Sequence, residues 1–294
     1  MALLQVEHET RYSYAWPVEY AQHMAFLRPL EDERQQVEAF EMTVDPVPAN
    51  HASGRDVHGN QRVFFSTTQP HQSLRVLARS RVRLAEPPPF DPAQTPPWEA
   101  VADRLRFHAG APFEPASEFC APSPFVPRLP ALRELAPEAL ASGRPLAEAA
   151  IALMRHIHRE FRYESDSTAV DTPLARVLAQ RRGVCQDFAH LMIGALRARG
   201  LAARYVSGYL LTTPPPGMAP LQGADASHAW VSVHCPGAPG GWFELDPTND
   251  LLPTMAHVRL AVGRDYGDVT PLRGVIRGGG EHALSVRVVT EQLG

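Results

Sequence analysis

Apolar and polar residues alternate along several stretches of the N-terminal part of the chain. Residues 4–8, 38–44 and 74–84 follow this period of two, which is typical of strands with one buried face. Turn-forming residues separate these stretches, and the Gly59-Asn60 pair suits a hairpin. Several short strands with turns between them predict a β-sandwich-like domain over residues 1–85.

Proline interrupts this pattern. Residues 86–130 contain Pro87-Pro88-Pro89, Pro96-Pro97 and several single prolines. Because proline removes a backbone donor and fixes φ, the segment is unsuited to regular structure. We therefore interpret it as the connection between two domains.

A helical period follows the proline-rich segment. Residues 146–162 carry apolar side chains at helical spacing, and a second amphipathic helix is predicted over residues 185–199, where Gly200 would end it. Residues 203–211 then have the composition of a strand, and a further strand pattern lies near the C-terminus. Helices and strands are therefore mixed in a second domain over residues 131–294.

Composition narrows the class of protein. The chain has 294 residues, which agrees with two domains at roughly 100–200 residues each. Its formal net charge of −4 gives no electrostatic reason to expect a nucleic-acid partner. The N-terminus lacks the features of a secretory signal, and no apolar run is long enough to span a membrane. Three cysteines cannot form a disulfide framework without one left over, so we expect a cytoplasmic protein with reduced thiols.

Cofactor and metal motifs are not evident in the sequence. His156 and His158 lie two apart on a predicted helix and therefore face different directions. No cysteine pair has zinc-ligand spacing, and residues 278–280, three glycines, indicate a turn and not a phosphate-binding loop. We expect neither a metal nor a cofactor.

Cys185 lies where a reactive thiol would be expected. It falls in the first turn of the predicted helix, after Arg181, Arg182 and Gly183. Unpaired N–H groups and the helix dipole favour an anion there, and the same N–H groups could bind the oxyanion of an attacked carbonyl. The simpler explanation is a small buried hydrophobe, which is how we interpret Cys120 and Cys235.

His228 and Asp246 are candidates for the base and for the group that orients it. His228 begins a predicted strand, Asp246 ends the next one, and a proline- and glycine-rich loop over residues 236–240 joins them. If the turn centres near residue 237 or 238, paired residues sum to roughly 474–476; His228 and Asp246 sum to 474, so their side chains would face each other across the hairpin. A slip of one residue would place them on opposite faces. Each residue alone has a simpler structural explanation, but the combination indicates a thiol nucleophile with its base and orienter.

These motifs resemble a known family. Three of them are similar to the core of the bacterial transglutaminase-like cysteine peptidases: Gly183-Val184-Cys185-Gln186-Asp187-Phe188, Ser227-His228-Ala229-Trp230 and Asp246-Pro247-Thr248-Asn249. The first 85 residues, with the segments at 8–12 and 56–60, resemble the β-rich N-terminal region that accompanies this core in many bacterial members. The resemblance implies an α+β fold with a papain-like catalytic core over residues 131–294, in which Cys185, His228 and Asp246 form the catalytic triad.

The resemblance also bears on the neighbours of the nucleophile. Gln186 stands where many relatives carry arginine, and Asp187 lies in the first helical turn, so we expect both to support the site. The Cys185 N–H is the expected oxyanion donor.

Three functions remain open at this point. A thiol-dependent amide hydrolase acting on a peptide or another amide-containing substrate is our first hypothesis, since water needs no acceptor site. Acyl transfer to an amine is the alternative, and a catalytically silent binding module on the same fold is the third. Fold analogy cannot choose among them.

Overall fold

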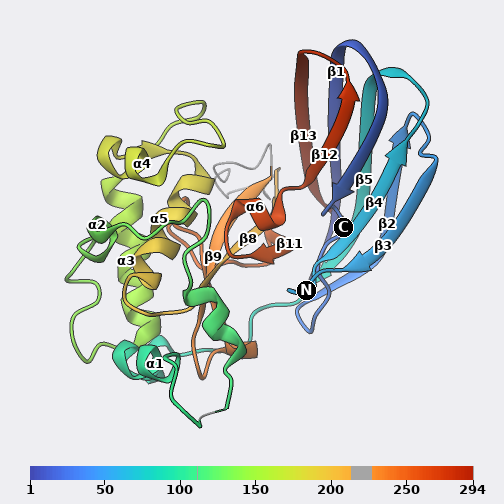
Figure 1. Cartoon of the computed structure of the whole chain (residues 1–294). Coiled ribbons are helices and arrows are strands. Elements are labelled where there is room, and N and C mark those ends of the chain that lie inside the picture. The colour runs from blue at the N-terminus through green and yellow to red at the C-terminus, as the bar shows by residue number, and fades with distance from the viewer. Residues whose placement is uncertain (111, 213–226, 294) are drawn as a thin grey trace.

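The structure, a computed structural model, describes residues 1–110, 112–212 and 227–293, and it has two halves (Figure 1). One half is a tall, bent β-sheet, and the other is a mixed helical and β-sheet domain beside it. The seven strands of the first sheet come from both ends of the chain: β1 (Ala2–Ala25), β2 (Gln35–Asp45), β3 (Asn50–Arg55), β4 (Gln61–Thr67), β5 (His71–Leu84), β12 (Leu272–Gly278) and β13 (His282–Leu293).

The first sheet is organised around the long strand β1. Strands β4 and β5 run antiparallel along one side of β1, one after the other, and β12 and β13 run in the same way along the other side. Beyond them, β3 pairs with β4 and β2 pairs with β5. The sheet therefore consists of four long, interrupted antiparallel strands.

Proline or glycine lies at the interruption of each long strand. Pro17 lies inside β1, Pro46 follows β2, Pro70 precedes β5, and residues 278–280 separate β12 from β13. Proline cannot donate to a ladder, and the three glycines have positive φ values of 90°, 85° and 65°. The sheet bends at these interruptions, and its two parts enclose a shared apolar core that includes Val18. This bent sheet is the β-sandwich-like part that the alternating pattern predicts.

Two boundaries predicted from the sequence need correction. The sequence pattern predicts residues 272–293 as part of the core domain, but they pair with β1 and belong to the first sheet. The proline-rich segment 86–130 is more than a connection, because Val101, Phe119 and Val126 are buried in the core of the second domain. Proline excluded long elements there, but it did not exclude short helical turns that pack.

The second domain is built on a four-stranded antiparallel sheet of order β10-β9-β8-β11. Helix α5 packs across β8 and β9, and α3 packs on α5. The strands of this domain are β6 (Arg162–Tyr163), β7 (Arg182–Gly183), β8 (Ala203–Leu210), β9 (His228–His234), β10 (Trp242–Leu245) and β11 (His257–Gly263). Its helices are α1 (Trp98–Arg104), α2 (Pro130–Arg133), α3 (Leu146–Glu160), α4 (Leu174–Gln180), α5 (Cys185–Arg197) and α6 (Tyr266–Val269), with short 3₁₀ turns at Pro92–Gln94, Pro115–Cys120 and Pro239–Gly241.

Two buried amide side chains join the halves. Gln35 bonds to both the N–H and the C=O of Arg259, at 2.8 and 2.7 Å. Asn60 bonds to the N–H and the C=O of Val262 in the same way, at 2.8 and 2.7 Å. Each amide thus takes the place of a neighbouring strand at the outer edge of β11. These bonds and the apolar contact of Val6 and Val288 with the second sheet fix the two halves together.

None of the helices in the described ranges is long and apolar enough to cross a membrane.

Candidate active site

Cys185 is the first residue of α5 and is partly exposed. Asp187 fixes this helix start, because its Oδ2 accepts the N–H of Val184 at 2.9 Å and the hydroxyl of Thr168 at 2.6 Å. A Cβ at Gly183 would lie 2.6 Å from the same oxygen, so glycine is required for this close approach. Because α5 starts at Cys185, the N–H of Cys185 has no carbonyl four residues earlier in the helix to bond. The predicted helix start and the supporting position of Asp187 are therefore present.

The side chain of Gln186 bonds to a neighbouring loop. Its side-chain amide donates to the carbonyl of Val170 at 3.0 Å. Together with the Asp187–Thr168 bond, this contact ties the loop that precedes α4 to the first turn of α5. Gln186 therefore helps to hold this loop beside the first turn of α5, and its side-chain amide is used in the hydrogen bond to Val170.

His228, the first residue of β9, is buried and bonds to Asp246. Its Nε2 lies 2.9 Å from Oδ2 of Asp246, and neither side chain is exposed to solvent. Its Nδ1 is buried and, within the described ranges, has no hydrogen-bond partner. Burial lowers the pKa of His228, but the charge and hydrogen bond of Asp246, with a further contribution from Cys185, raise it overall to well above the usual value. These interactions favour the doubly protonated imidazolium form of His228.

Asp246 follows β10 directly and is completely buried. Its Oδ1 accepts the backbone N–H groups of Thr248 at 2.9 Å and Asn249 at 3.2 Å. Its Oδ2 accepts the side-chain amide of Asn249 at 2.8 Å and Nε2 of His257 at 3.3 Å, in addition to His228. Burial raises the pKa of Asp246, but the two histidines outweigh this and hold it far below the usual range. The carboxylate is ionised and fixed in orientation.

The hairpin register differs by two residues from the one that would place His228 opposite Asp246. Trp242 pairs with His234 and Leu245 with Val231, so Asp246 lies beyond the last pair and diagonal to His228. Side chains two residues apart on a strand share a face, so the two groups still meet. The sequence therefore predicts the correct face, whereas the turn of Pro239–Gly241 sets the register.

His257 and Trp230 also belong to this cluster, although the sequence pattern does not mark either as a site residue. His257 accepts the N–H of Thr254 through Nδ1 at 3.4 Å, which leaves Nε2–H to donate to Asp246. Trp230 stacks on His228 with ring centroids 6.1 Å apart, and its indole N–H donates to Glu244 at 3.1 Å. Trp230 was visible as part of the His228 motif, but no local signal distinguishes His257 from the other twelve histidines.

The other two cysteines have settings that suppress reactivity. Burial raises the pKa of Cys120 to about 11 and that of Cys235 to about 12. A thiol with such a pKa is almost entirely protonated at neutral pH. Both therefore fit the structural role that the sequence indicates.

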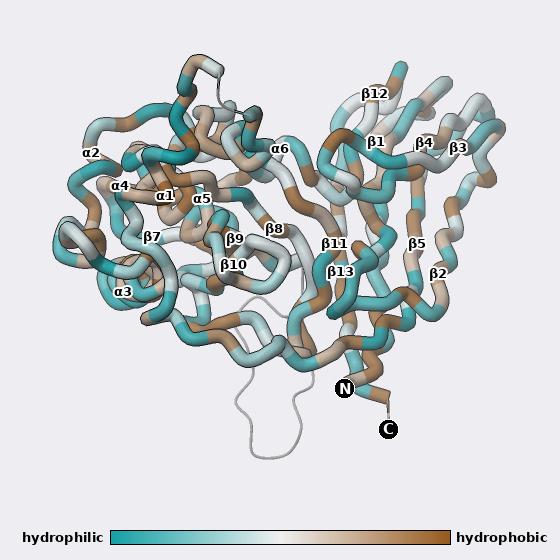
Figure 2. The backbone as a smooth tube through the Cα atoms, turned by 90° about the horizontal axis from the view of Figure 1, so that it is seen from below, coloured by the Kyte–Doolittle hydropathy of each residue, from teal (hydrophilic) through white to brown (hydrophobic). Residues whose placement is uncertain are grey.

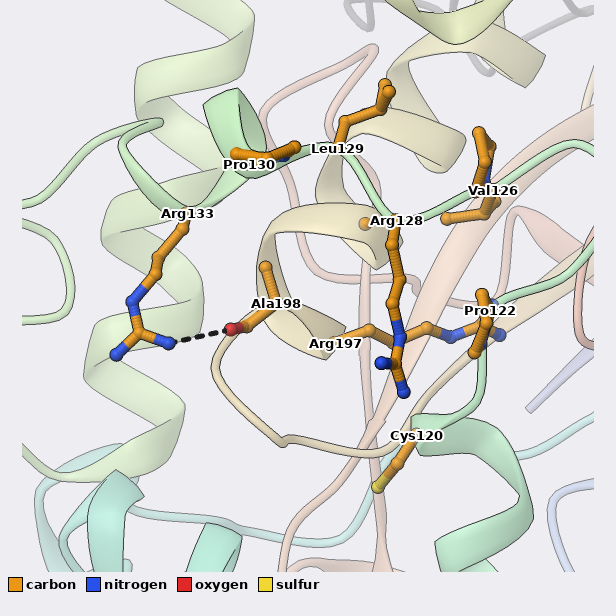
Figure 3. Close-up of a pocket in the computed structure, with 11 residues that line it drawn as sticks. Cys120, Pro122, Val126, Arg128, Leu129, Pro130, Arg133, Arg197 and Ala198 are labelled. Atoms are coloured by element: carbon orange, nitrogen blue, oxygen red, sulfur yellow. Dashed lines mark hydrogen bonds between the residues drawn. The ribbon is translucent and has the colours of Figure 1, made fainter.

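A cavity of about 370 Å³ lies at the other end of α5 from Cys185 (Figure 3). Cys120 and Arg197 line it, and Arg133 at its edge donates to the carbonyl of Ala198 at 3.2 Å. None of Cys185, His228 and Asp246 is among its lining residues. In the described ranges, no group of three or more histidine, cysteine or acidic side chains is arranged to hold a metal ion.

Known proteins resemble this chain along most of its length. The model of the bacterial transglutaminase-like N-terminal region matches residues 4–83, and that of the transglutaminase-like superfamily matches residues 133–247. An uncharacterised protein of Mycobacterium tuberculosis is 42% identical over 285 residues, which are 95% of this chain and 89% of that protein. A protein-glutamine gamma-glutamyltransferase of Pseudomonas aeruginosa is 34% identical over 128 residues, or 42% of this chain and 19% of that protein.

A solved structure has the same fold. It is that of a candidate cysteine protease from Cytophaga hutchinsonii, with a TM-score of 0.77 over 100% of this chain and 91% of that chain, at 21% identity. These findings confirm the resemblance inferred from the motifs and the α+β fold. The chain belongs to the transglutaminase-like superfamily, with the bacterial transglutaminase-like N-terminal region in front of the core.

Proposed function

We propose that this protein is a thiol-dependent amide hydrolase in which Cys185, His228 and Asp246 act as nucleophile, base and orienter. The observation that carries the proposal is the ring orientation of His228. Its Nε2 bonds to Asp246 at 2.9 Å, while Nδ1 stays free of the carboxylate, and Cys185 contributes to the raised pKa of the ring. This is the arrangement that a thiolate–imidazolium pair needs.

The steps of the reaction follow from these positions. In the resting enzyme the thiol proton resides on Nδ1 of His228, which leaves a thiolate at the start of α5, where the helix dipole stabilises it. The Sγ of Cys185 attacks the amide carbonyl carbon, and the oxyanion receives the N–H of Cys185. His228 then gives its proton to the leaving amine, and the C–N bond breaks to leave a thioester. Water, deprotonated by His228, attacks the thioester and releases the acid with the regenerated thiol.

Asp246 does not shuttle a proton in this scheme. Its five hydrogen bonds keep it ionised and fix the ring of His228 with Nε2–H toward the carboxylate. His257 acts through Asp246 as a positioning residue.

Acyl transfer is the second candidate, and the relative that is a protein-glutamine gamma-glutamyltransferase favours it. In that reaction a primary amine would attack the thioester in place of water, after losing a proton to His228. The chain itself contains no lysine, so its side chains offer no primary amine as an internal acceptor.

The test has two stages. First, iodoacetamide is applied at mildly acidic pH, and modification of each cysteine is followed by peptide mass mapping. We expect Cys185 to react much faster than Cys120 and Cys235, and equal rates at all three would contradict the proposal and favour a silent binding module.

The second stage separates hydrolysis from transfer. A glutamine-containing peptide is incubated with and without a primary amine such as putrescine, and product masses are compared with those of the Cys185→Ala variant. Hydrolysis gives the free acid in both mixtures, whereas transfer gives the amine adduct. Because the chain has no lysine, an adduct can only contain the added amine or an N-terminal amine.

A further inference from the structure

Trp230 packs on both imidazoles that bond to Asp246. It lies two residues after His228 on β9, so the two side chains share a face of the strand. The indole stacks on His228 with an interplanar angle of 27° and meets His257 edge-on, at centroid distances of 6.1 and 5.4 Å. Trp230 is fully buried. Asp246 therefore holds His228 through one ring nitrogen, whereas Trp230 lies against a face of the same ring.

A glycine in the next strand makes room for this indole. Gly208 on β8 is the register partner of His228 on β9 and of Arg259 on β11. A Cβ at Gly208 would lie 2.3 Å from Cη2 and 2.6 Å from Cζ3 of Trp230. The six-membered part of the indole therefore lies directly on the backbone of β8, which prevents the ring from moving toward the sheet.

Glu244 holds the indole N–H of Trp230. Nε1 of the indole donates to Oε2 of Glu244 at 3.1 Å. Glu244 is the register partner of Ser232, two residues after Trp230, so its side chain lies on the same face of the sheet. A buried indole N–H needs an acceptor, and a carboxylate forms a stronger hydrogen bond than a neutral group. Glu244 therefore fixes the direction of the indole N–H beside His228.

Arg259 links Glu244 to the N-terminal domain. It lies on β11, the outer strand of the second sheet on the side of the first sheet (Figure 2). Its Nη1 lies 3.6 Å from Oε1 of Glu244 and 2.6 Å from Oδ2 of Asp32, and its Nη2 donates to Oδ1 of Asp32 at 2.7 Å. Asp32 belongs to the connection between β1 and β2, where its Oδ1 also accepts the N–H groups of Arg34 and Gln35 at 2.8 and 3.1 Å. A continuous row of contacts, which we call the Asp32 row, therefore joins the N-terminal domain to the indole: Asp32, Arg259, Glu244 and Trp230.

Packing alone does not explain the Asp32 row. A phenylalanine at position 230 and an apolar residue at position 244 would fill the same space without a buried charge. Instead, the side chains of Arg259 and Glu244 are only 13% and 10% exposed, and removing two charges from water costs free energy that an apolar pair would not cost. The charges add a fixed direction for the indole N–H, and therefore a fixed ring plane against His228.

We propose that Trp230 positions His228 for its pair with Cys185, and that the N-terminal domain holds Trp230 in place through the Asp32 row. The inference rests on the proposed function and gives the N-terminal domain a part in it. The face of an indole attracts a cation, so Trp230 favours the imidazolium form of His228 and with it the thiolate of Cys185. If the ring is lost or turned, the imidazole is free to tilt and the thiolate forms at a higher pH.

The experiment measures the rate of Cys185 alkylation by iodoacetamide in the full chain from about pH 5 to about pH 9, followed by peptide mass mapping. The free energy of unfolding of each variant is measured in urea. A residue that only fills the core would lower the free energy of unfolding and leave the pH profile of alkylation in the folded protein unchanged. A positioning residue for His228 would change the profile itself.

Trp230→Leu removes the ring. It should slow alkylation at about pH 5 by about three- to tenfold, which is the effect of one cation–π contact on the population of the thiolate. Trp242→Leu is the matched control, because Trp242 on β10 is also partly buried but contacts His234 and Arg204 and not His228. The control should lower the free energy of unfolding and leave the pH profile unchanged.

Two substitutions of Glu244 test the hydrogen bond to the indole. Glu244→Ala leaves the indole N–H without its acceptor, so the ring is free to turn, and alkylation at about pH 5 should slow by about two- to fivefold. Glu244→Gln keeps an acceptor oxygen at the same place and should restore most of the wild-type rate. Both variants retain Trp230, so they also separate the orientation of the ring from its volume.

Asp32→Asn tests the link to the N-terminal domain. Asparagine keeps an acceptor for the N–H groups of its turn but loses the charge that holds Arg259. The guanidinium is then free to close on Oε1 of Glu244 and draw this carboxylate away from the indole, so alkylation at about pH 5 should slow at least about twofold. Glu31→Gln is the matched control, because this neighbouring carboxylate pairs with Arg28 at the surface and has a similar exposure, 40% against 41% for Asp32.

Unchanged pH profiles in Trp230→Leu and Glu244→Ala would overturn the inference as a whole. An unchanged profile in Asp32→Asn would overturn the part given to the N-terminal domain. If Trp230→Leu does not fold, the difference between Glu244→Ala and Glu244→Gln decides in its place, and equal rates in these two variants would count against the inference. Slow alkylation of Cys185 in the wild type would instead refute the proposed function, whereas a fast wild type with unaltered variants refutes only the role of Trp230.

Discussion

Replacing Asp246 by asparagine tests the link between the buried carboxylate and the reactivity of Cys185. The carboxylate accepts two backbone N–H groups through Oδ1 and three side-chain donors through Oδ2. An asparagine amide has only one acceptor oxygen. If its NH₂ takes the place of Oδ1, it faces two N–H groups that cannot turn. If it takes the place of Oδ2, it faces the amide of Asn249 and two imidazoles. At least two bonds are lost in either orientation.

The magnitude follows from these bonds. A hydrogen bond to a charged group contributes about 1.5–3 kcal/mol, so the loss of two should lower the free energy of unfolding by about 3–6 kcal/mol. The histidine also loses the negative charge that raises its pKa, and an asparagine NH₂ at Oδ2 would favour the tautomer with the proton on Nδ1. Alkylation of Cys185 at about pH 6 should therefore slow toward the rates of the two buried cysteines.

The assay combines urea unfolding, followed by tryptophan fluorescence, with the pH dependence of Cys185 alkylation. Glu7→Gln is the matched control, because it also replaces a carboxylate by an amide but at a surface pair that is 39% exposed on the glutamate side. The control should change stability by less than about 1 kcal/mol. If Asp246→Asn unfolds within 1 kcal/mol of the wild type, or alkylation at about pH 6 is unchanged, the reasoning about Asp246 is refuted.

Three further predictions concern stability. Gly208→Ala would place a methyl group 2.2 Å from a backbone oxygen and should lower the free energy of unfolding in urea by about 1–3 kcal/mol. Gly54→Ala is the control, because a methyl group there would have nothing within 4 Å and should leave the free energy of unfolding unchanged. Equal effects of the two substitutions would contradict the packing argument. Asn60→Ala leaves the buried N–H and C=O of Val262, at the outer edge of β11, without their partner and should lower the free energy of unfolding by about 2–5 kcal/mol. Asn50→Ala, at an exposed asparagine, is the control and should change the free energy of unfolding little. The folded-state pKa of His228 is raised from 6.5 to about 10, so its contribution to stability should be fully present below pH 6.5 and be lost as the pH rises toward 10. Urea unfolding across this pH range should show a decline in wild type that is absent from His228→Gln, and parallel curves would refute the assignment.

Local physical chemistry was enough to predict several parts of the site from the sequence. The apolar stripe and Gly200 indicated the helix that starts at Cys185, and it spans Cys185–Arg197 in the structure. Alternation and the proline- and glycine-rich loop indicated the hairpin that carries His228 and Asp246. Each of these depends on residues close together in the chain. The expectation of a cytoplasmic location and the choice of hydrolysis over acyl transfer stay predictions.

Tertiary structure decided what depends on residues far apart in the sequence. The pairing of residues 272–293 with β1 joins the two ends of the chain, and an alternating pattern does not name its partner strand. His257 reaches Asp246 only because β11 lies in the same sheet, on the far side of β8 from β9. Gln35 and Asn60 are polar, so the sequence pattern predicts them at the surface. In the structure they are buried, because their side-chain amides form the hydrogen bonds that the backbone at the edge of β11 would otherwise lack. The sequence by itself determined the helix that begins at Cys185 and the hairpin that carries His228 and Asp246, because both depend on local pattern, while the packed fold determined which distant residues hold Asp246 in place.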